Sequence, residues 1–231
     1  LRMSAVPFEL TEEDRLQLAQ WRKTIKIVSC FADRYLVHGT MRTSLSDERA
    51  RYVPTPVRDA FLNANKGSSS DGPIVVSLGS LTPETLTPIL EGSTHQFVIY
   101  GSKNPRREKN VEYKAFNEEA FIESLKCSPF AIVAANSSAI DSLAAGKPLL
   151  YCPSPGHLEQ KFCGKMFEHL GVAKLTMTLN SREIDDFAKN LAPYRKGIEK
   201  LDIFDNDGLV REIEGAIREC RQKQMASTAA N

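Results

Sequence analysis

The chain has 231 residues, of which 42% are hydrophobic and 26% are charged, with 13 glycines and 12 prolines. This mixture is ordinary for a globular protein and argues against a fibrous or disordered chain. The 30 Lys and Arg residues nearly balance 29 Asp and Glu residues, and the net charge of +1 gives no overall field that attracts nucleic acid or anionic lipid. We therefore expect no nucleic-acid partner.

The cysteines and the apolar runs indicate in which cellular compartment the protein functions. An odd number of cysteines without any CxxC pair argues against a disulfide scaffold and favours a reducing compartment. They are Cys30, Cys127, Cys152, Cys163 and Cys220. No apolar run approaches the roughly 18 to 20 residues of a membrane span. We expect a cytoplasmic protein or one peripheral to a membrane, and the first residue, Leu1, leaves open that the sequence is a piece of a longer one.

The first 72 residues predict a short α/β segment and a connection. A capping box at Thr11 begins a helix that runs to about Arg22. Two strands follow, at 25–30 and 35–38, and then a proline-rich turn and a short helical piece at 57–62. Residues 63–72, NANKGSSSDG, have the composition of a flexible connection.

From residue 73 onward, short apolar runs alternate with amphipathic helices, which is typical of a parallel sheet with crossover helices. The predicted strands are 73–78, 96–100, 111–113, 130–134 and 148–152. The predicted helices begin near Thr82, Asn117, Ser137 and Glu159, and a last one carries Leu209, Ile213 and Ile217. This pattern predicts a doubly wound α/β domain, a fold that binds ligands at the carboxyl ends of its strands.

Several common motifs are absent from the sequence. It contains no GxxxxGK[ST], no GxGxxG after the first strand of this domain, no GxSxG and no HExxH. The histidines are too far apart in sequence to predict a metal cluster; they are His38, His95, His157 and His169. We therefore expect no metal and no cofactor.

Two charged groups are interpreted as solvated surface. The carboxylates Asp185 and Asp186 lie on a predicted helix. The basic residues of the second group form a predicted loop and are Lys103, Arg106, Arg107 and Lys109. Contact with a lipid-linked acceptor or an anionic membrane is the alternative for this loop.

Two strand-end loops carry small and hydroxylic residues suited to an anion. Gly79 and Ser80 follow the strand 73–78, where backbone N–H groups can approach a ligand, although a plain tight turn has the same sequence. Ser137 and Ser138 open a helix whose dipole favours a phosphate, although a serine N-cap would look identical. Asp141 lies one turn further on the same face and can accept bonds from a sugar diol.

A third loop, 153–158, leads into a helix that begins with Glu159 and Gln160. A carboxylate beside a carboxamide can form hydrogen bonds with neighbouring hydroxyls of a sugar. The alternative is that both residues simply suit the first turn of a helix.

These residues together resemble a known family. The run 73–174 is similar to the C-terminal, donor-binding half of GT-B glycosyltransferases, in particular the group of the lipid II GlcNAc transferase and the UDP-glycosyltransferases. Residues 74–80 resemble its VSFGS-type strand and loop, 137–148 its SxxEAxxxGxP stretch, and 159–173 its EQxxNAxxxxxxGxA stretch. The match depends on the order and spacing of these motifs, and it covers a little under half of the chain.

The resemblance implies a GT-B type α/β fold and donor contacts for nine residues. Those implied to face the diphosphate are Gly79, Ser80, Ser137 and Ser138. Asp141 stands at the ribose-binding Glu position. Those implied to face the transferred sugar are Glu159 and Gln160, and those near the base are Phe116 and Asn117.

Three departures from the family pattern are visible. Ala134 and Ala135 replace the usual glycine pair, Asp141 is one methylene shorter than the usual Glu, and 163–164 is Cys-Gly where the family has Asn-Ala. We expect an altered donor geometry or a lower affinity.

The resemblance also implies a domain organisation. Residues 1–66 would be a remnant of an N-terminal acceptor-side domain, a Rossmann-like domain that usually supplies the catalytic base. Residues 67–72 would be a linker, 73–204 the nucleotide-sugar donor-binding domain, and 205–231 a helix that packs back toward the N-terminal part.

The implied activity is inverting, metal-independent transfer of a hexosyl group from a UDP-sugar donor to the hydroxyl of an unknown acceptor, lipid-linked or small. One alternative is a non-catalytic or partner-dependent nucleotide-sugar-binding subunit, completed by a partner subunit or by a missing N-terminal domain. A third is a GT-B type sugar-nucleotide epimerase.

Overall fold

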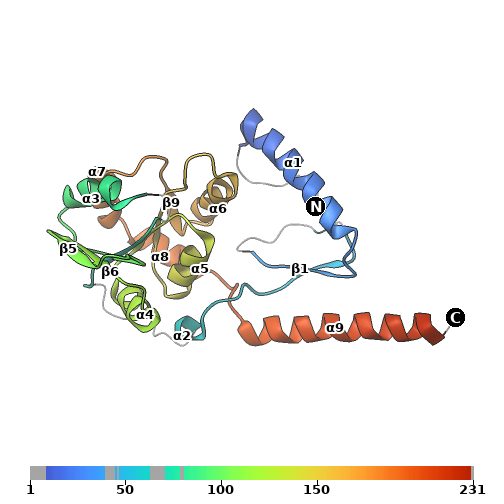
Figure 1. Cartoon of the computed structure of the whole chain (residues 1–231). Helices are drawn as coiled ribbons and strands as arrows, with labels where there is room; N and C mark the ends of the chain where they lie inside the picture. The colour runs from blue at the N-terminus through green and yellow to red at the C-terminus, as the bar shows by residue number, and fades with distance from the viewer. Residues whose placement is uncertain (1–8, 40–44, 46, 63–70, 79–80, 230–231) are drawn as a thin grey trace. The chain divides into compact units, whose positions relative to one another are not determined.

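The computed structural model describes residues 9–39, 45, 47–62, 71–78 and 81–229, and the chain forms two compact units. One unit is Leu1–Pro56 with Asp202–Asn231, and the other is Val57–Leu201 (Figure 1). Most of the predicted linker 67–72 lies outside the described residues, so this linker stays a prediction. Within the described ranges, no helix is long and apolar enough to cross a lipid bilayer.

The smaller unit pairs two short parallel strands with two helices. Its elements are α1 (Glu12–Ser29), β1 (Tyr35–Val37), β2 (Ala50–Tyr52) and α9 (Asn206–Ala229). The predicted capping box is present, because Thr11 accepts a bond from the Asp14 N–H and Asp14 accepts one from the Thr11 N–H. Glu219 of α9 binds Arg34 and Arg51, each at 2.9 Å, so the last helix is tied to the strand region of this unit.

The predicted strand at Ile25–Cys30 is wrong, because these residues continue α1 to Ser29. The β-branched residues of this stretch favoured a strand over a helix. Once a helix has been nucleated, however, each added residue gains a backbone hydrogen bond, and a β-branched residue costs only about 0.7 kcal/mol or less relative to Ala. No Gly or Pro stands between Arg22 and Ser29 to end the helix.

The larger unit contains a seven-stranded sheet, counted over the described residues, in the order β5-β6-β4-β3-β7-β8-β9. The strands are β3 (Ile74–Ser77), β4 (Phe97–Tyr100), β5 (Arg106–Glu108), β6 (Val111–Lys114), β7 (Ala131–Val133), β8 (Leu149–Tyr151) and β9 (Ala173–Leu175). The helices are α2 (Asp59–Leu62), α3 (Pro83–Glu91), α4 (Glu118–Cys127), α5 (Asn136–Ala144), α6 (Leu158–His169), α7 (Ser181–Ala188) and α8 (Ala192–Ile198). All neighbouring strands are parallel except β5 with β6, which confirms the predicted doubly wound sheet.

Two of these strands were not predicted, β5 and β9. The interpretation of 103–109 as a basic loop is wrong for Arg106–Glu108, which pair antiparallel with β6. An edge strand has one unpaired side and half-exposed residues, so its sequence does not show the apolar run of a buried strand. Arg106 lies over the ring of Tyr113 at 4.3 Å, and Lys109 binds Glu91 at 2.6 Å.

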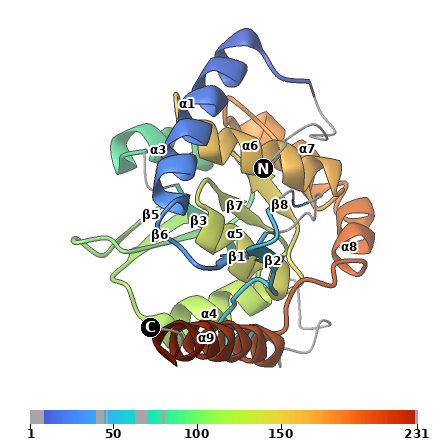
Figure 2. The same ribbon diagram turned by 90° about the vertical axis from the view of Figure 1, so that its right-hand side faces the viewer.

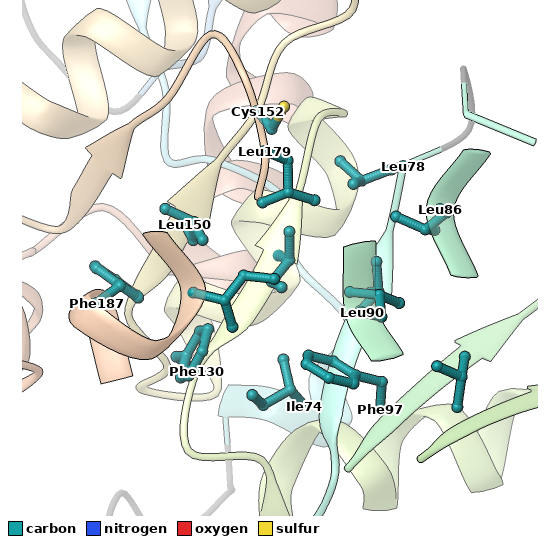
Figure 3. Packing of buried hydrophobic residues seen from close by; sticks show 14 of the residues in the cluster. Ile74, Leu78, Leu86, Leu90, Phe97, Phe130, Leu150, Cys152, Leu179 and Phe187 are labelled. Carbon is teal, nitrogen blue, oxygen red and sulfur yellow. The ribbon is translucent and has the colours of Figure 1, made fainter. Parts of the chain in front are cut away.

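The main core lies between the sheet and the helices α3 and α7. Leu86 and Leu90 of α3 and Phe187 of α7 pack on residues of the central strands, among them Ile74 of β3 (Figure 3). Every residue of β7 and β8 is buried, as expected for parallel strands covered on both faces.

The order of the strands positions the candidate site. From β3 the chain proceeds to β4 and β6 on one side, and from β7 to β8 and β9 on the other. The loops after β3 and β7 therefore diverge at the carboxyl edge, which is where such sheets bind ligands. Figure 2 shows β3 and β7 with α5 in this region.

Gly164 of α6 tests the packing between this helix and the sheet. A Cβ at this position would lie 2.6 Å from Leu175 Cδ1 and 2.8 Å from the Tyr151 ring, so Gly164→Ala should lower the free energy of unfolding by about 1–3 kcal/mol. Gly215 of α9 is the matched control, because a Cβ there meets nothing within 4 Å. Gly215→Ala should be neutral or stabilising. Urea unfolding measures both, and equal stability of the two variants would contradict this packing.

Candidate functional site

A cavity of about 150 Å³ lies at the carboxyl ends of β3 and β4 and the amino end of α5, all in the larger unit. It is lined by Arg58, Val76, Ser77, Tyr100, Phe116, Phe121, Ser137, Ser138 and Asp141. Residues far apart in sequence meet here because β3 lies between β4 and β7. The cavity therefore stands at the switch point of the sheet, the usual place for a ligand in this fold.

The amino end of α5 reaches this cavity without a side-chain cap. The N-cap residue is Ala135, and its side chain makes no hydrogen bond to the first turn. The alternative of a serine N-cap is therefore wrong, since Ser137 and Ser138 lie inside the first turn. Backbone N–H groups at the start of a helix have no partner within the helix, and together with the dipole they favour an anion.

Two hydroxyl groups, one from the end of β3 and one from the first turn of α5, meet in the cavity. The oxygens of Ser77, at the end of β3, and Ser138, after β7, lie 2.9 Å apart and share a hydrogen bond. The Ser138 carbonyl accepts a bond from the Ser142 hydroxyl at 2.7 Å, which anchors this part of α5. Ser137 is exposed, so its hydroxyl is accessible to a ligand.

Asp141 and Arg58 form an ion pair on one wall of the cavity. Asp141 is buried, with 6% of its surface exposed, and its carboxylate accepts a bond from the Arg58 guanidinium. Arg58 also donates from Nε to Glu118 at 3.0 Å and lies over the ring of Phe121 at 5.9 Å. Burial raises the pKa of the Asp141 carboxyl, and the charge of Arg58 opposes this shift.

The sequence reasoning missed Arg58. It precedes the predicted flexible connection 63–72, which groups it with the N-terminal part, whereas the structure places it at the start of the larger unit. A single Arg in the predicted helical piece 57–62 is the available signal, and it carries no motif of its own.

Aromatic side chains form a second wall. The Tyr100 hydroxyl donates to the Ala120 carbonyl at 2.7 Å, and its ring packs edge-on against Phe121 at 5.6 Å. Phe116 lies 6.3 Å from Phe121 and is 61% exposed, so a face of apolar surface is open beside the cavity. Tyr100 and Phe121 were not predicted, because nothing in a buried-strand or helix pattern marks them as site residues.

Four of the nine predicted site residues line the cavity: Phe116, Ser137, Ser138 and Asp141. Gly79 and Ser80 lie outside the described residues. Asn117 caps α4 by accepting a bond from the Ala120 N–H at 2.8 Å.

Glu159 and Gln160 do not line the cavity. Glu159 accepts a bond from the Asn136 amide at 2.9 Å, and Gln160 accepts one from the Ser154 N–H at 2.8 Å. Glu159 is therefore bonded to the start of α5 and Gln160 to the loop after β8, and their implied role toward a sugar stays a prediction.

Residues at two of the departures from the family pattern make contacts with Tyr151 or lie beside its ring. The carbonyl of Ala134 accepts a bond from the buried Tyr151 hydroxyl at 2.6 Å. The Tyr151 ring occupies the space beside Gly164, so a residue without a side chain is needed there. Burial raises the pKa of the neighbouring Cys163 thiol to about 11, although a hydrogen bond with Asn136 opposes the shift. This cysteine is therefore a neutral packing residue near neutral pH.

Among the residues that the structure describes, no group of three His, Cys, Asp or Glu side chains could hold a metal ion. The expected metal independence stays a prediction.

Comparison with known proteins identifies the family. The family model described as "Glycosyl transferase family 1" matches residues 2–192. The chain belongs to this glycosyltransferase family. The resemblance to GT-B glycosyltransferases is thereby confirmed, together with the α/β fold class. No curated protein matches the chain.

Solved structures of glycosyltransferases share this fold. The calicheamicin glycosyltransferase CalG4 has a TM-score of 0.60 at 17% identity, over 94% of this chain and 68% of CalG4. The spinosyn forosaminyltransferase SpnP has a TM-score of 0.53 at 15% identity, over 94% of this chain and 64% of SpnP. Os79 from O. sativa, solved in complex with UDP, has a TM-score of 0.55 at 17% identity, over 74% of this chain and 49% of Os79. This chain thus spans about two thirds of the length of SpnP and CalG4.

The ionisation of Asp141 predicts a pH dependence of stability. Because the folded pKa lies above the ordinary value of 3.8, the contribution of this group is complete below 3.8 and is lost as the pH rises through the folded value. The free energy of unfolding of the wild type should therefore fall relative to that of Asp141→Asn as the pH rises from below 3.8.

Urea unfolding across this pH range measures the difference, with the exposed carboxyl variant Asp186→Asn as the control. A wild type that gains stability relative to Asp141→Asn as the pH rises would show that the attraction of Arg58 outweighs burial.

Proposed function

We propose that the cavity binds a nucleotide-sugar donor, a UDP-sugar, and that the whole protein transfers its hexosyl group to an acceptor hydroxyl. One observation carries this proposal: the uncapped amino end of α5, the Ser137 and Ser138 hydroxyls and the Arg58 guanidinium converge on one cavity at the switch point. These groups donate hydrogen bonds or carry positive charge, and the pyrophosphate is the part of a nucleotide-sugar that both would bind.

The diphosphate would lie at the start of α5. First-turn N–H groups of the helix and the two serine hydroxyls offer hydrogen bonds, and Arg58 offers charge. Gly79 and Ser80, which follow β3 in the sequence, are proposed to add backbone N–H groups from the neighbouring strand end.

The base would lie against the aromatic wall. Phe116 is exposed at the cavity and presents apolar surface on which a planar ring can stack. Os79, which shares the fold, was solved in complex with UDP, and this supports a uridine nucleotide. Asn117 is proposed to contribute through its backbone, since its side chain is engaged in the cap of α4.

The transferred sugar would lie toward α6. Glu159 and Gln160 begin this helix after β8, the next strand beyond β7, and so stand at the same edge of the sheet as α5. Their acceptor oxygens are bonded to Asn136 and Ser154, so sugar binding requires the exchange of these bonds.

The proposed reaction is inverting and needs no metal. The acceptor hydroxyl loses its proton to a base and attacks the anomeric carbon, while the bond from that carbon to the UDP oxygen breaks and UDP leaves with the electron pair. The described residues contribute the stabilisation of negative charge on the departing diphosphate, which is most effective when the donors are already oriented. No residue of this chain is assigned as the base.

A second candidate is a nucleotide-sugar-binding subunit that depends on a partner for transfer. The observation in its favour is that the alignment covers 94% of this chain and 64% of SpnP, so about a third of SpnP lies outside the alignment.

Ser138→Ala tests the donor site. Loss of a hydroxyl that faces the diphosphate should weaken UDP binding by about 1–3 kcal/mol, measured by isothermal titration calorimetry. Ser29→Ala is the control, because the Ser29 hydroxyl belongs to the smaller unit, where it donates to the Lys26 carbonyl at 2.9 Å.

The absence of heat with UDP and UDP-sugars in the wild type would overturn the donor site, and unchanged affinity of Ser138→Ala would place it elsewhere. Binding without transfer or donor hydrolysis would support the partner-dependent subunit.

A further inference from the structure

We propose that Asp141 is a positioning residue that holds Arg58 toward the phosphates of the donor and does not itself bind the ribose. The inference rests on the proposed function and reverses the role that the sequence resemblance implied for this residue.

The first argument is the occupancy of the carboxylate. Asp141 is buried, its side chain is 8% exposed, and its Oδ2 is bound by Arg58 Nη1. A charge-assisted hydrogen bond is about twice as strong as one between neutral groups, so a ribose hydroxyl is a poor competitor for this oxygen. A bidentate grip on a sugar diol would also require both carboxylate oxygens.

The second argument is the length of the side chain. Asp is one methylene shorter than the Glu that stands at this position in the resembling family, so its carboxylate remains closer to α5. The guanidinium, which is 38% exposed at the side chain, reaches from this buried carboxylate into the cavity.

The third argument is the support of Arg58. Its two ion-pair partners differ in burial, since the Glu118 side chain is 59% exposed and that of Asp141 is 8% exposed. Exposed pairs contribute little, about 0–1 kcal/mol, so Glu118 alone is a weak anchor. The buried Asp141 is therefore the partner that decides where the guanidinium lies.

The fourth argument is charge. A buried carboxylate in a cavity that receives a diphosphate would repel it. The pair with Arg58 neutralises Asp141, and the planar guanidinium has further N–H donors that can bind phosphate oxygens. In this arrangement, Asp141 strengthens anion binding only through Arg58.

A double-mutant cycle tests the inference, with UDP and uridine as the two probes. Arg58→Gln should weaken UDP binding about 10-fold or more, and Asp141→Asn about 3- to 10-fold. In the Arg58→Gln background, Asp141→Asn should no longer weaken UDP binding, because its favourable effect passes through Arg58, and loss of the carboxylate that Arg58 no longer neutralises should leave the UDP affinity unchanged or raise it. Affinity for uridine, which has the ribose but no phosphate, should not change in any variant, and NMR titration measures it.

Glu118→Gln is the matched control, because it removes the exposed partner of the same guanidinium and should change UDP affinity less than Asp141→Asn. Circular dichroism establishes that each variant is folded. If Asp141→Asn is not folded, Asp141→Glu decides: a longer carboxylate displaces Arg58 and weakens UDP but not uridine, whereas a ribose-binding residue would strengthen uridine.

Three results would overturn the inference while the proposed function stands. The first is that Asp141→Asn weakens UDP binding equally in the wild-type and the Arg58→Gln background. The second is that Asp141→Asn weakens uridine binding. The third is that Arg58→Gln leaves UDP affinity unchanged. A wild-type chain that binds no UDP would overturn the proposed function itself, and the inference with it.

Discussion

The parallel pairing of β3 with β7 is the constraint on which the candidate site depends. It sets Ser77 beside Val133 in register and brings the Ser138 hydroxyl within 2.9 Å of the Ser77 hydroxyl, across 61 positions of sequence. The chain leaves these strands in opposite directions, so the space above them is not filled by a connecting loop. The dense core of α3 and α7 on the sheet fixes this register, because a shift by one residue would turn the apolar side chains away from it.

The charged groups that line the cavity are bonded to one another. The positive end of α5 and the Arg58 guanidinium favour an anion, while Asp141 and Glu118 hold that guanidinium on one wall. The two carboxylates differ in burial, and burial determines which of them is an anchor. Binding of a diphosphate, as proposed for this cavity, is favoured by positive potential that is already oriented before the ligand arrives. Under the proposed positioning role of Asp141, the departure from Glu to Asp at this position is a change of role as well as of length.

Much of the larger unit was predictable, because its signals are local. The apolar runs of β3, β4, β7 and β8 and the capping residues Thr82 and Asn117 were found within about two residues of their positions in the structure. The failures have physical reasons. Ile25–Cys30 has strand-forming residues that an established helix overrode, and β5 is an edge strand without an apolar run. In the site, Ser137, Ser138 and Asp141 were predicted from their place after a buried strand, and Arg58 was not.

The sequence by itself determined the alternation of strands and helices, the hydroxyl-rich start of α5 and the resemblance to GT-B glycosyltransferases. Each of these depends on residues that are close together in the sequence. Only the tertiary structure decided that Ala135 and not a serine stands at the N-cap position of α5, that Glu159 is bonded to Asn136 and Gln160 to Ser154, and that Arg58 reaches Asp141 across 83 positions. Such partnerships depend on which strands are neighbours and on which side chains are shielded from water. Neither property has a local signature, since both arise from the packing of the whole sheet.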